Sequence, residues 1–180
     1  ATTAVDYTGS SSADTFIMMH KGDSIAGGAS SDTLDVNYAS VLGGISVNLN
    51  AAAGVNQIST MDGGAISGSV TGFENVDLSG YTGAGASVTA YASVTGIGSV
   101  ITGTAALDSI TGGSGADTVN ASAGTDVINL GSGNDKFVFT EVAAVETVDG
   151  QGGTGDALVV AAGVAIANSI VLDTYTNFEK

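Results

Sequence analysis

The stretch GTAALDSIT GGSGADTVN ASAGTDVIN LGSGNDKFV, residues 103–138, decides the fold. It divides into four consecutive blocks of nine residues, and every block has an aspartate at its sixth position and an apolar side chain at its eighth. The aspartates are Asp108, Asp117, Asp126 and Asp135, and the apolar residues are Ile110, Val119, Ile128 and Phe137. Self-similarity at a fixed period predicts a stack of repeats rather than a single irregular core.

Each block is predicted to form a turn and a strand. In residues 112–120, three glycines allow turn conformations with positive φ, and a very short strand follows with its eighth position facing inward. Two blocks complete one coil of 18 residues, so Asp108 lies next to Asp126 at the roughly 4.7–4.9 Å spacing of a parallel sheet. Asp117 and Asp135 stack in the same way on the opposite side. The pattern therefore predicts an all-β fold, a parallel β-roll or β-helix solenoid.

The same register recurs more weakly near the N-terminus, in the blocks GSSSADTFI, MMHKGDSIA and GGASSDTLD of residues 9–35. Their sixth positions are Asp14, Asp23 and Asp32. Asp14 and Asp32 are 18 residues apart and form a plausible stacked pair. Asp23 departs from the pattern, because Lys21 stands where the other run favours glycine and Val41, 18 residues further on, is not acidic.

The remaining sequence predicts strands without acidic turns. Residues 45–50 alternate apolar and polar side chains, which indicates a strand. We divide the chain into N-terminal repeats (1–38), a solenoid or strand region without acidic turns (39–102), the main repeats (103–158) and closing strands (159–180). Residues 71–75 (TGFEN) resemble residues 176–180 (TNFEK), so we expect the chain to continue in a longer protein. Glu146 is expected in an exposed loop.

Composition excludes several classes of function. The chain has 28 Gly, no Pro, Cys or Trp, and 3 Lys or Arg against 18 Asp or Glu, which gives a net charge of -15. A surface this negative lacks the cations that nucleic acids and anionic lipids require. The absence of Cys excludes disulfides and thiolate zinc sites. No uncharged stretch predicts a transmembrane segment, and no nucleophile–base motif indicates an enzyme.

Residues 112–120 resemble the repeats-in-toxin (RTX) nonapeptide, the hemolysin-type calcium-binding repeat, at every defined position. The resemblance is strong over 103–138, weak over 9–35, and shifted in register over 149–158. It implies a parallel β-roll with several Ca²⁺ ions between the turns, held by sixth-position carboxylates and glycine carbonyls. The candidate ligands are Asp14, Asp23, Asp32, Asp108, Gly112, Gly115, Asp117, Gly124, Asp126, Gly131, Gly133, Asp135 and Asp156. Asp156 is a doubtful ligand because it lies 21 residues beyond Asp135 rather than 18.

The chemistry of the residues favours the same metal. Ca²⁺ takes six to eight oxygen ligands in flexible geometry, whereas Mg²⁺ demands a tighter octahedron. Carboxylates stacked about 5 Å apart repel one another unless a cation lies between them. Calcium is therefore the expected partner, and it is expected to act as a folding ligand.

Three functions fit these features. We favour a calcium-dependent module of a bacterial surface-layer (S-layer) protein, because the long Thr, Ala, Gly and Ser stretches suit a scaffold. Such a module would self-associate into a surface lattice or contact cell-surface polysaccharide. The alternatives are an adhesin or motility-associated surface protein, and the RTX domain of a secreted toxin or hydrolase. The resemblance implies secretion, by the type I route, to the cell surface or the medium.

Overall fold

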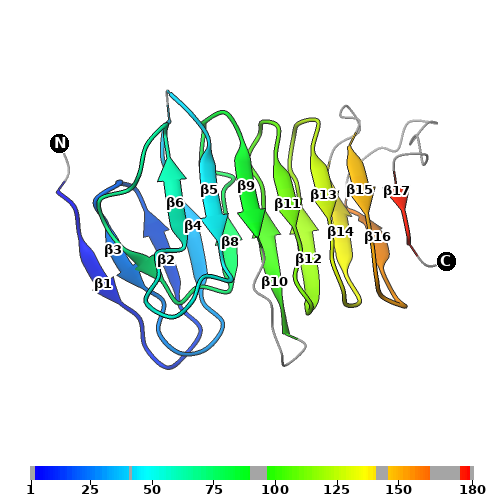
Figure 1. Ribbon diagram of the computed structural model, residues 1–180, viewed down its shortest axis with the longest axis horizontal. Coiled ribbons are helices and arrows are strands. Elements are labelled where there is room, and N and C mark those ends of the chain that lie inside the picture. The colour runs from blue at the N-terminus through cyan, green and yellow to red at the C-terminus, as the bar shows by residue number, and fades with distance from the viewer. Residues whose placement is uncertain (1–2, 41, 90–96, 141–145, 163–174, 179–180) are drawn as a thin grey trace.

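The computed structural model describes residues 3–40, 42–89, 97–140, 146–162 and 175–178, and within these every regular element is a β-strand. The strands stack side by side along one long axis, from β1 at the N-terminal end to β17 at the C-terminal end (Figure 1). Two long sheets and one short sheet form the walls of the stack. The predicted all-β solenoid is confirmed.

The first long sheet has seven strands, all of them parallel. Its register pairs Thr118 with Lys136 and Val119 with Phe137, which is the predicted offset of 18 residues. In spatial order the strands are β2 (Thr15–Met18), β4 (Thr33–Val36), β8 (Asn75–Asp77), β10 (Ile97–Thr102), β12 (Ala116–Asn120), β14 (Lys136–Phe139) and β16 (Ala157–Val160).

The second long sheet also has seven strands, and only its β5–β6 pair is antiparallel. This hairpin lies at the N-terminal edge of the sheet, in the region without repeats. In spatial order the strands are β6 (Ile58–Met61), β5 (Ile45–Asn48), β9 (Ala86–Thr89), β11 (Ser109–Thr111), β13 (Val127–Asn129), β15 (Thr147–Asp149) and β17 (Tyr175–Thr176). A short parallel sheet of β1 (Asp6–Thr8), β3 (Ser24–Ala26) and β7 (Val70–Thr71) completes the N-terminal coils.

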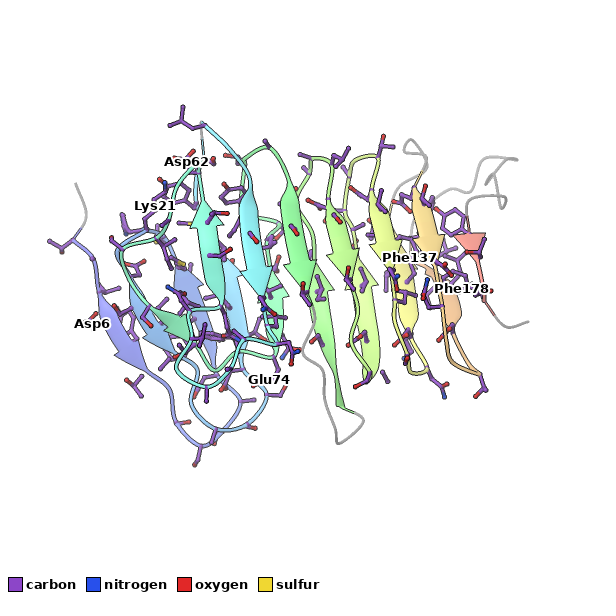
Figure 2. The ribbon with its side chains drawn as sticks, viewed as in Figure 1. Asp6, Lys21, Asp62, Glu74, Phe137 and Phe178 are labelled. Carbon is purple, nitrogen blue, oxygen red and sulfur yellow. The ribbon has the colours of Figure 1, made fainter. Side chains whose placement is uncertain are left out.

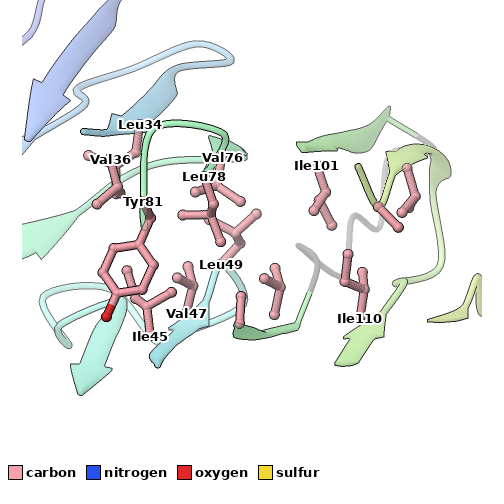
Figure 3. Packing of buried hydrophobic residues seen from close by; sticks show 14 of the residues in the cluster. Leu34, Val36, Ile45, Val47, Leu49, Val76, Leu78, Tyr81, Ile101 and Ile110 are labelled. Atoms are coloured by element: carbon pink, nitrogen blue, oxygen red, sulfur yellow. The ribbon is translucent and has the colours of Figure 1, made fainter. Parts of the chain in front are cut away.

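The core lies between the two long sheets. Figure 3 shows Leu34, Val76 and Ile101 of the first sheet facing Val47 and Ile110 of the second. The eighth positions of the main repeats are all inside, with relative exposures of 1% or less for Ile110, Val119, Ile128 and Phe137. Burial of such a side chain stabilises the fold by about 1.5–3 kcal/mol, so one residue per strand supports each coil.

Coil length varies outside residues 103–138. The in-register partners Val127 and Thr147 are 20 residues apart, and Lys136 and Ala157 are 21 apart. Within the first long sheet the largest departure joins β4 to β8, whose paired residues Thr33 and Asn75 are 42 apart. The chain between them forms β5, β6 and β7 before it returns to the first sheet. Extra residues are therefore accommodated between strands, and the strand register itself is kept.

The ninth position of a block closes the turn that follows it. Asn120 Oδ1 accepts a hydrogen bond from the Ser122 N–H at 3.0 Å, and Asn129 Oδ1 accepts one from Gly131 N–H at 3.1 Å. Asp149 does the same for the Gln151 N–H at 3.0 Å. Short polar side chains that bond the backbone two residues on favour turns over continued strand. The strands β12, β13 and β15 therefore end at this Asn or Asp.

Candidate calcium sites

One column of polar side chains runs along the turns that precede the first long sheet. The strand pairing places its members in register from coil to coil. We call it the first column, and it consists of Asp14, Asp32, Glu74, Ser99, Asp117, Asp135 and Asp156. Four of its carboxylates are almost fully buried, with relative exposures of 0–2% for Asp32, Asp117, Asp135 and Asp156.

Hydrogen bonds link the members of the first column in one direction. The Asp117 N–H donates to Asp135 Oδ1 at 2.8 Å, and the Asp14 N–H donates to Asp32 Oδ1 at 2.8 Å. The second oxygen of Asp117 accepts the N–H of Gly113, in its own turn, at 2.7 Å. Each carboxylate thus joins two coils, and backbone donors hold it in a fixed orientation.

A second, shorter column precedes the second long sheet and consists of Asp108, Asp126 and Glu146. The Asp108 N–H donates to Asp126 Oδ1 at 2.8 Å, and the Thr104 N–H donates to Asp108 Oδ2 at 2.7 Å. Glu146 is 2% exposed and accepts a hydrogen bond from the Tyr175 hydroxyl at 2.8 Å. The expectation that Glu146 lies in an exposed loop is therefore wrong, because Glu146 is buried directly before β15, which pairs in register with β13.

Two predicted ligands stand differently from the rest. Asp156 lies in register with Asp135 despite the separation of 21 residues, and its Oδ1 accepts the Asp135 N–H at 2.8 Å. Asp23 belongs to the short sheet, and its coil-to-coil neighbour is Gly68 rather than an acid. Its oxygens accept backbone hydrogen bonds, among them those from Val5 at 3.2 Å and His20 at 2.9 Å. Asp23 thus has the geometry of a turn cap, and its role as a ligand stays a prediction.

Among the described residues, buried carboxylate oxygens without a hydrogen-bond partner include Oδ2 of Asp135, in the main repeats, and Oδ2 of Asp32, in the N-terminal repeats. A buried anionic oxygen without a partner is costly, and proteins offset this cost with a donor or a cation. These two atoms therefore indicate where a cation would complete the structure.

Glycines leave the space in which oxygens from adjacent coils approach. A methyl group on Gly133 would lie 3.0 Å from Asp135 Oδ1 and would collide with the Gly115 carbonyl oxygen. A methyl group on Gly124 would meet Asp126 Oδ1 at 2.7 Å and a carbonyl oxygen of the preceding coil at 2.6 Å. Gly124 and Gly133 both have φ of +143°, which L side chains rarely adopt. Only glycine fits these positions.

Gly112, at the first position of its block, shows this arrangement on the other carboxylate oxygen. A methyl group on Gly112 would lie 3.0 Å from Asp117 Oδ2 and would collide with the Leu130 carbonyl oxygen of the next coil. A methyl group on Gly131, which has φ of +88° and holds the second position of its block, would collide with the Gly113 carbonyl oxygen. A carboxylate oxygen and a carbonyl oxygen are both acceptors, so they cannot bond to each other. Their convergence suits a cation.

Burial raises the pKa of the column carboxylates. The pKa values of Asp108 and Asp117 are raised mainly by desolvation, although hydrogen bonds to their charged forms oppose the shift. For Asp135 desolvation and the neighbouring charges of Asp117 and Asp156 raise the pKa to about 6. The two ion pairs found among the described residues, Lys21–Asp62 and His20–Asp23, lie outside both columns. A bound divalent cation would reverse these shifts.

The donor set fits calcium. No group of three or more His, Cys, Asp or Glu side chains gathers within the part of the chain that the structure describes. A cation in the columns would therefore be held by two carboxylates at most and by backbone carbonyls, and all of these ligands are oxygens. Flexible oxygen coordination of this kind suits Ca²⁺ better than Mg²⁺ or a transition metal. The residues that would hold it in the main repeats are Asp108, Gly112, Gly115, Asp117, Gly124, Asp126, Gly131, Gly133, Asp135 and Asp156.

Comparison with known families agrees with this geometry. Residues 102–137 match the RTX calcium-binding nonapeptide repeat, in four copies. The match covers about a fifth of the 180 residues and ends within β14. The matched repeat is a calcium-binding one. No curated protein and no solved structure gives a significant match to the chain.

Of the residues the structure describes, none belong to a helix long and apolar enough to cross a membrane. The uncharged stretch that starts at Ala157 begins with strand β16. Residues 163–174 lie outside the described residues.

Proposed function

We propose that this chain is a calcium-dependent structural module of a secreted cell-surface protein. The observation that carries the proposal is the buried, unpartnered Oδ2 of Asp135, inside the matched RTX repeats. The carbonyls of the glycine turns converge beside the same carboxylate. Oδ1 of Asp135 accepts the Asp117 N–H, whereas Oδ2 has no hydrogen-bond partner, and Ca²⁺ would supply the one that it lacks.

Calcium would act on folding. Without it, the buried carboxylates of the two columns repel one another, and the glycine-rich turns lose much conformational entropy on folding. A ligand that binds only the folded state stabilises it by RT ln(1 + [L]/Kd), about 2.7 kcal/mol per site at 100 times Kd. Several sites in one stack would therefore decide whether the repeats fold. This supports a protein that stays loose in low calcium and folds in the calcium-rich medium outside a cell.

Within this class we propose assembly in a surface layer. The outer face of the second long sheet supports this, because it presents short hydroxyl side chains in rows, such as Ser46, Ser87 and Ser109 in register. Few cations interrupt the surface, since the chain has 3 Lys or Arg. Flat faces of this kind favour contact with another copy of the chain or with cell-surface polysaccharide.

Calcium titration followed by electron microscopy tests the proposal. We expect circular dichroism to show a cooperative gain of β-structure as Ca²⁺ is added to chelator-treated protein, with no such gain for Mg²⁺. Ordered lattices in the calcium-loaded sample would support the surface-layer function. Soluble monomers would favour the repeat domain of a toxin or hydrolase, and glycan binding by monomers would favour an adhesin. Identical spectra with and without calcium would contradict the whole proposal.

A further inference from the structure

Glu74 takes the position of a repeat aspartate although no nonapeptide surrounds it. In the main repeats, the N–H of one aspartate donates to the carboxylate of the next coil, and its carbonyl accepts the N–H that follows that carboxylate. Asp32 makes both bonds with the segment at Glu74. Its N–H donates to Glu74 Oε2 at 2.9 Å, and its carbonyl accepts the Asn75 N–H at 3.0 Å. Glu74 therefore extends the column across a separation of 42 residues.

An unpartnered anionic oxygen lies at this junction. Asp32 is 0% exposed; its Oδ1 accepts the Asp14 N–H, and its Oδ2 has no hydrogen-bond partner. A methyl group on Gly27 would lie 2.9 Å from this Oδ2 and would collide with the Gly72 carbonyl oxygen. The main repeats show the same convergence at Gly112.

A cavity adjoins the junction on the side of Gly72 and Glu74. Gly72 and Glu74 line a cavity of about 180 Å³ beside the loop at residues 51–55. Glu74 lies at the turns on the lower side of the solenoid in Figure 2, away from the Lys21–Asp62 ion pair. Gly72 has φ of +72° in the turn, which fits glycine. Oxygen ligands from two coils are the feature that a Ca²⁺ site requires.

We propose that Asp32, Glu74 and the Gly72 carbonyl form a cation site for a hard divalent ion such as Ca²⁺, outside the matched repeats. The inference rests on the proposed calcium binding for the identity of the ion. The site joins the N-terminal repeats to β8, the strand in which the chain returns to the first long sheet after β5, β6 and β7. Its role is to make one continuous column out of two runs of repeats that are separate in the sequence.

Calorimetric titration of Ca²⁺ into the full chain and into three variants tests this site. Glu74→Gln keeps an oxygen acceptor for the Asp32 N–H but removes the charge, and we expect it to bind about one equivalent less than the unaltered chain. Asp77→Asn is the matched control, because it removes one charge from β8, the strand directly after Glu74, outside the column, and should keep every equivalent. Asp117→Asn should lose binding in the main repeats and keep the Glu74 site.

Nuclear magnetic resonance of the unaltered chain gives a second readout that does not depend on how a variant folds. The amide signals of Gly27, Asp32 and Gly72 should shift on addition of Ca²⁺, and this shift should be absent in Glu74→Gln. If Glu74→Gln keeps all equivalents and these amides do not respond while the main repeats bind, the site is disproved and the proposed function stands. If the unaltered chain binds no Ca²⁺, both are disproved.

Discussion

The C-terminal and N-terminal halves of the solenoid follow the same register but are stabilised differently. From β10 to β15 each strand adds one or two buried apolar side chains, such as Val119 or Ile128, and the buried carboxylates lie on both sides. The N-terminal half buries Phe73, Tyr81 and Leu78 as well. It has the larger apolar core, and it continues only the first column, since the buried Asp23 and Asp62 lie outside it.

Side-chain hydrogen bonds also hold the N-terminal half together. Buried Gln57 donates to the carbonyls of Leu49 and Phe73 at 3.0 and 2.7 Å, and accepts the Phe73 N–H at 3.0 Å. Asp62 accepts the Ser40 hydroxyl at 2.6 Å and pairs with Lys21 at 4.0 Å, as the neighbouring labels in Figure 2 indicate. The chain between β4 and β8, which leaves the regular coils, is thus held by its own polar hydrogen bonds. The strict nonapeptide repeats depend instead on their two columns and on the cation that the columns would bind.

Removal of calcium is expected to have the largest effect, and to separate the halves. In chelator, strands β11–β15 should lose their hydrogen-exchange protection by orders of magnitude, because repulsion in both columns is no longer offset. Strands β4, β5 and β8 should stay protected by their apolar core. Mass spectrometry of peptides from the two halves measures this. Equal protection loss in both halves would contradict the comparison.

Loss of a single column carboxylate should have the next largest effect. Asp117→Ala leaves the buried N–H groups of Ser99 and Gly113 without their acceptor, at about 1–3 kcal/mol each. We expect a loss of roughly 3 kcal/mol or more in the free energy of unfolding, measured with urea in saturating calcium. The matched change Asp14→Ala affects a partly exposed carboxylate, which accepts hydrogen bonds from Ser10, and should cost about 1 kcal/mol because water replaces it. Similar losses at the two sites would show that burial in the column is unimportant.

Glycine substitutions should show a smaller contrast. Gly133→Ala introduces both an unfavourable φ of +143° and a collision with the Gly115 carbonyl, so we expect about 2–3 kcal/mol of destabilisation. Gly54→Ala also has positive φ, of +77°, but nothing lies within 4 Å of the added methyl group. It should cost about 1 kcal/mol. Thermal unfolding of both variants, in calcium, measures the difference, and a costlier Gly54→Ala would argue against close packing of the coils.

The pH dependence should be the smallest effect and should change sign with calcium. In chelator, the folded-state pKa of Asp135, about 6, lies above its ordinary value of 3.8. The folded chain therefore holds a proton that the unfolded chain has released, so stability falls as the pH rises from about 4 to 6. In calcium, protons compete with the ion, and stability should rise over the same window. Urea unfolding at several pH values checks both slopes, and the same sign in both media would contradict a metal site at Asp135.

The sequence predicts the main repeats well because their information is local. Asp108, Asp117, Asp126 and Asp135 are 18 residues from their partners, so counting is sufficient to place them. The apolar eighth positions follow from the same count.

Counting fails where the loops change length. Asp156 and Glu146 are in register only because the loops before them absorb three and two extra residues, as the separations of 21 and 20 show. Glu74 joins the first column through a pairing across 42 residues, and no local pattern marks it. These positions depend on long-range strand pairing and side-chain packing, and the echo of residues 71–75 at 176–180 was the only signal near Glu74.

A crystal structure of the calcium-loaded chain, with anomalous scattering to identify the metal, tests the central claim most directly. We predict anomalous peaks in both columns, including one between Asp117 and Asp135, with carbonyl oxygens of the glycine turns completing each coordination shell. Well-ordered columns without such peaks at saturating calcium, or peaks only on the outer surface, would contradict the account.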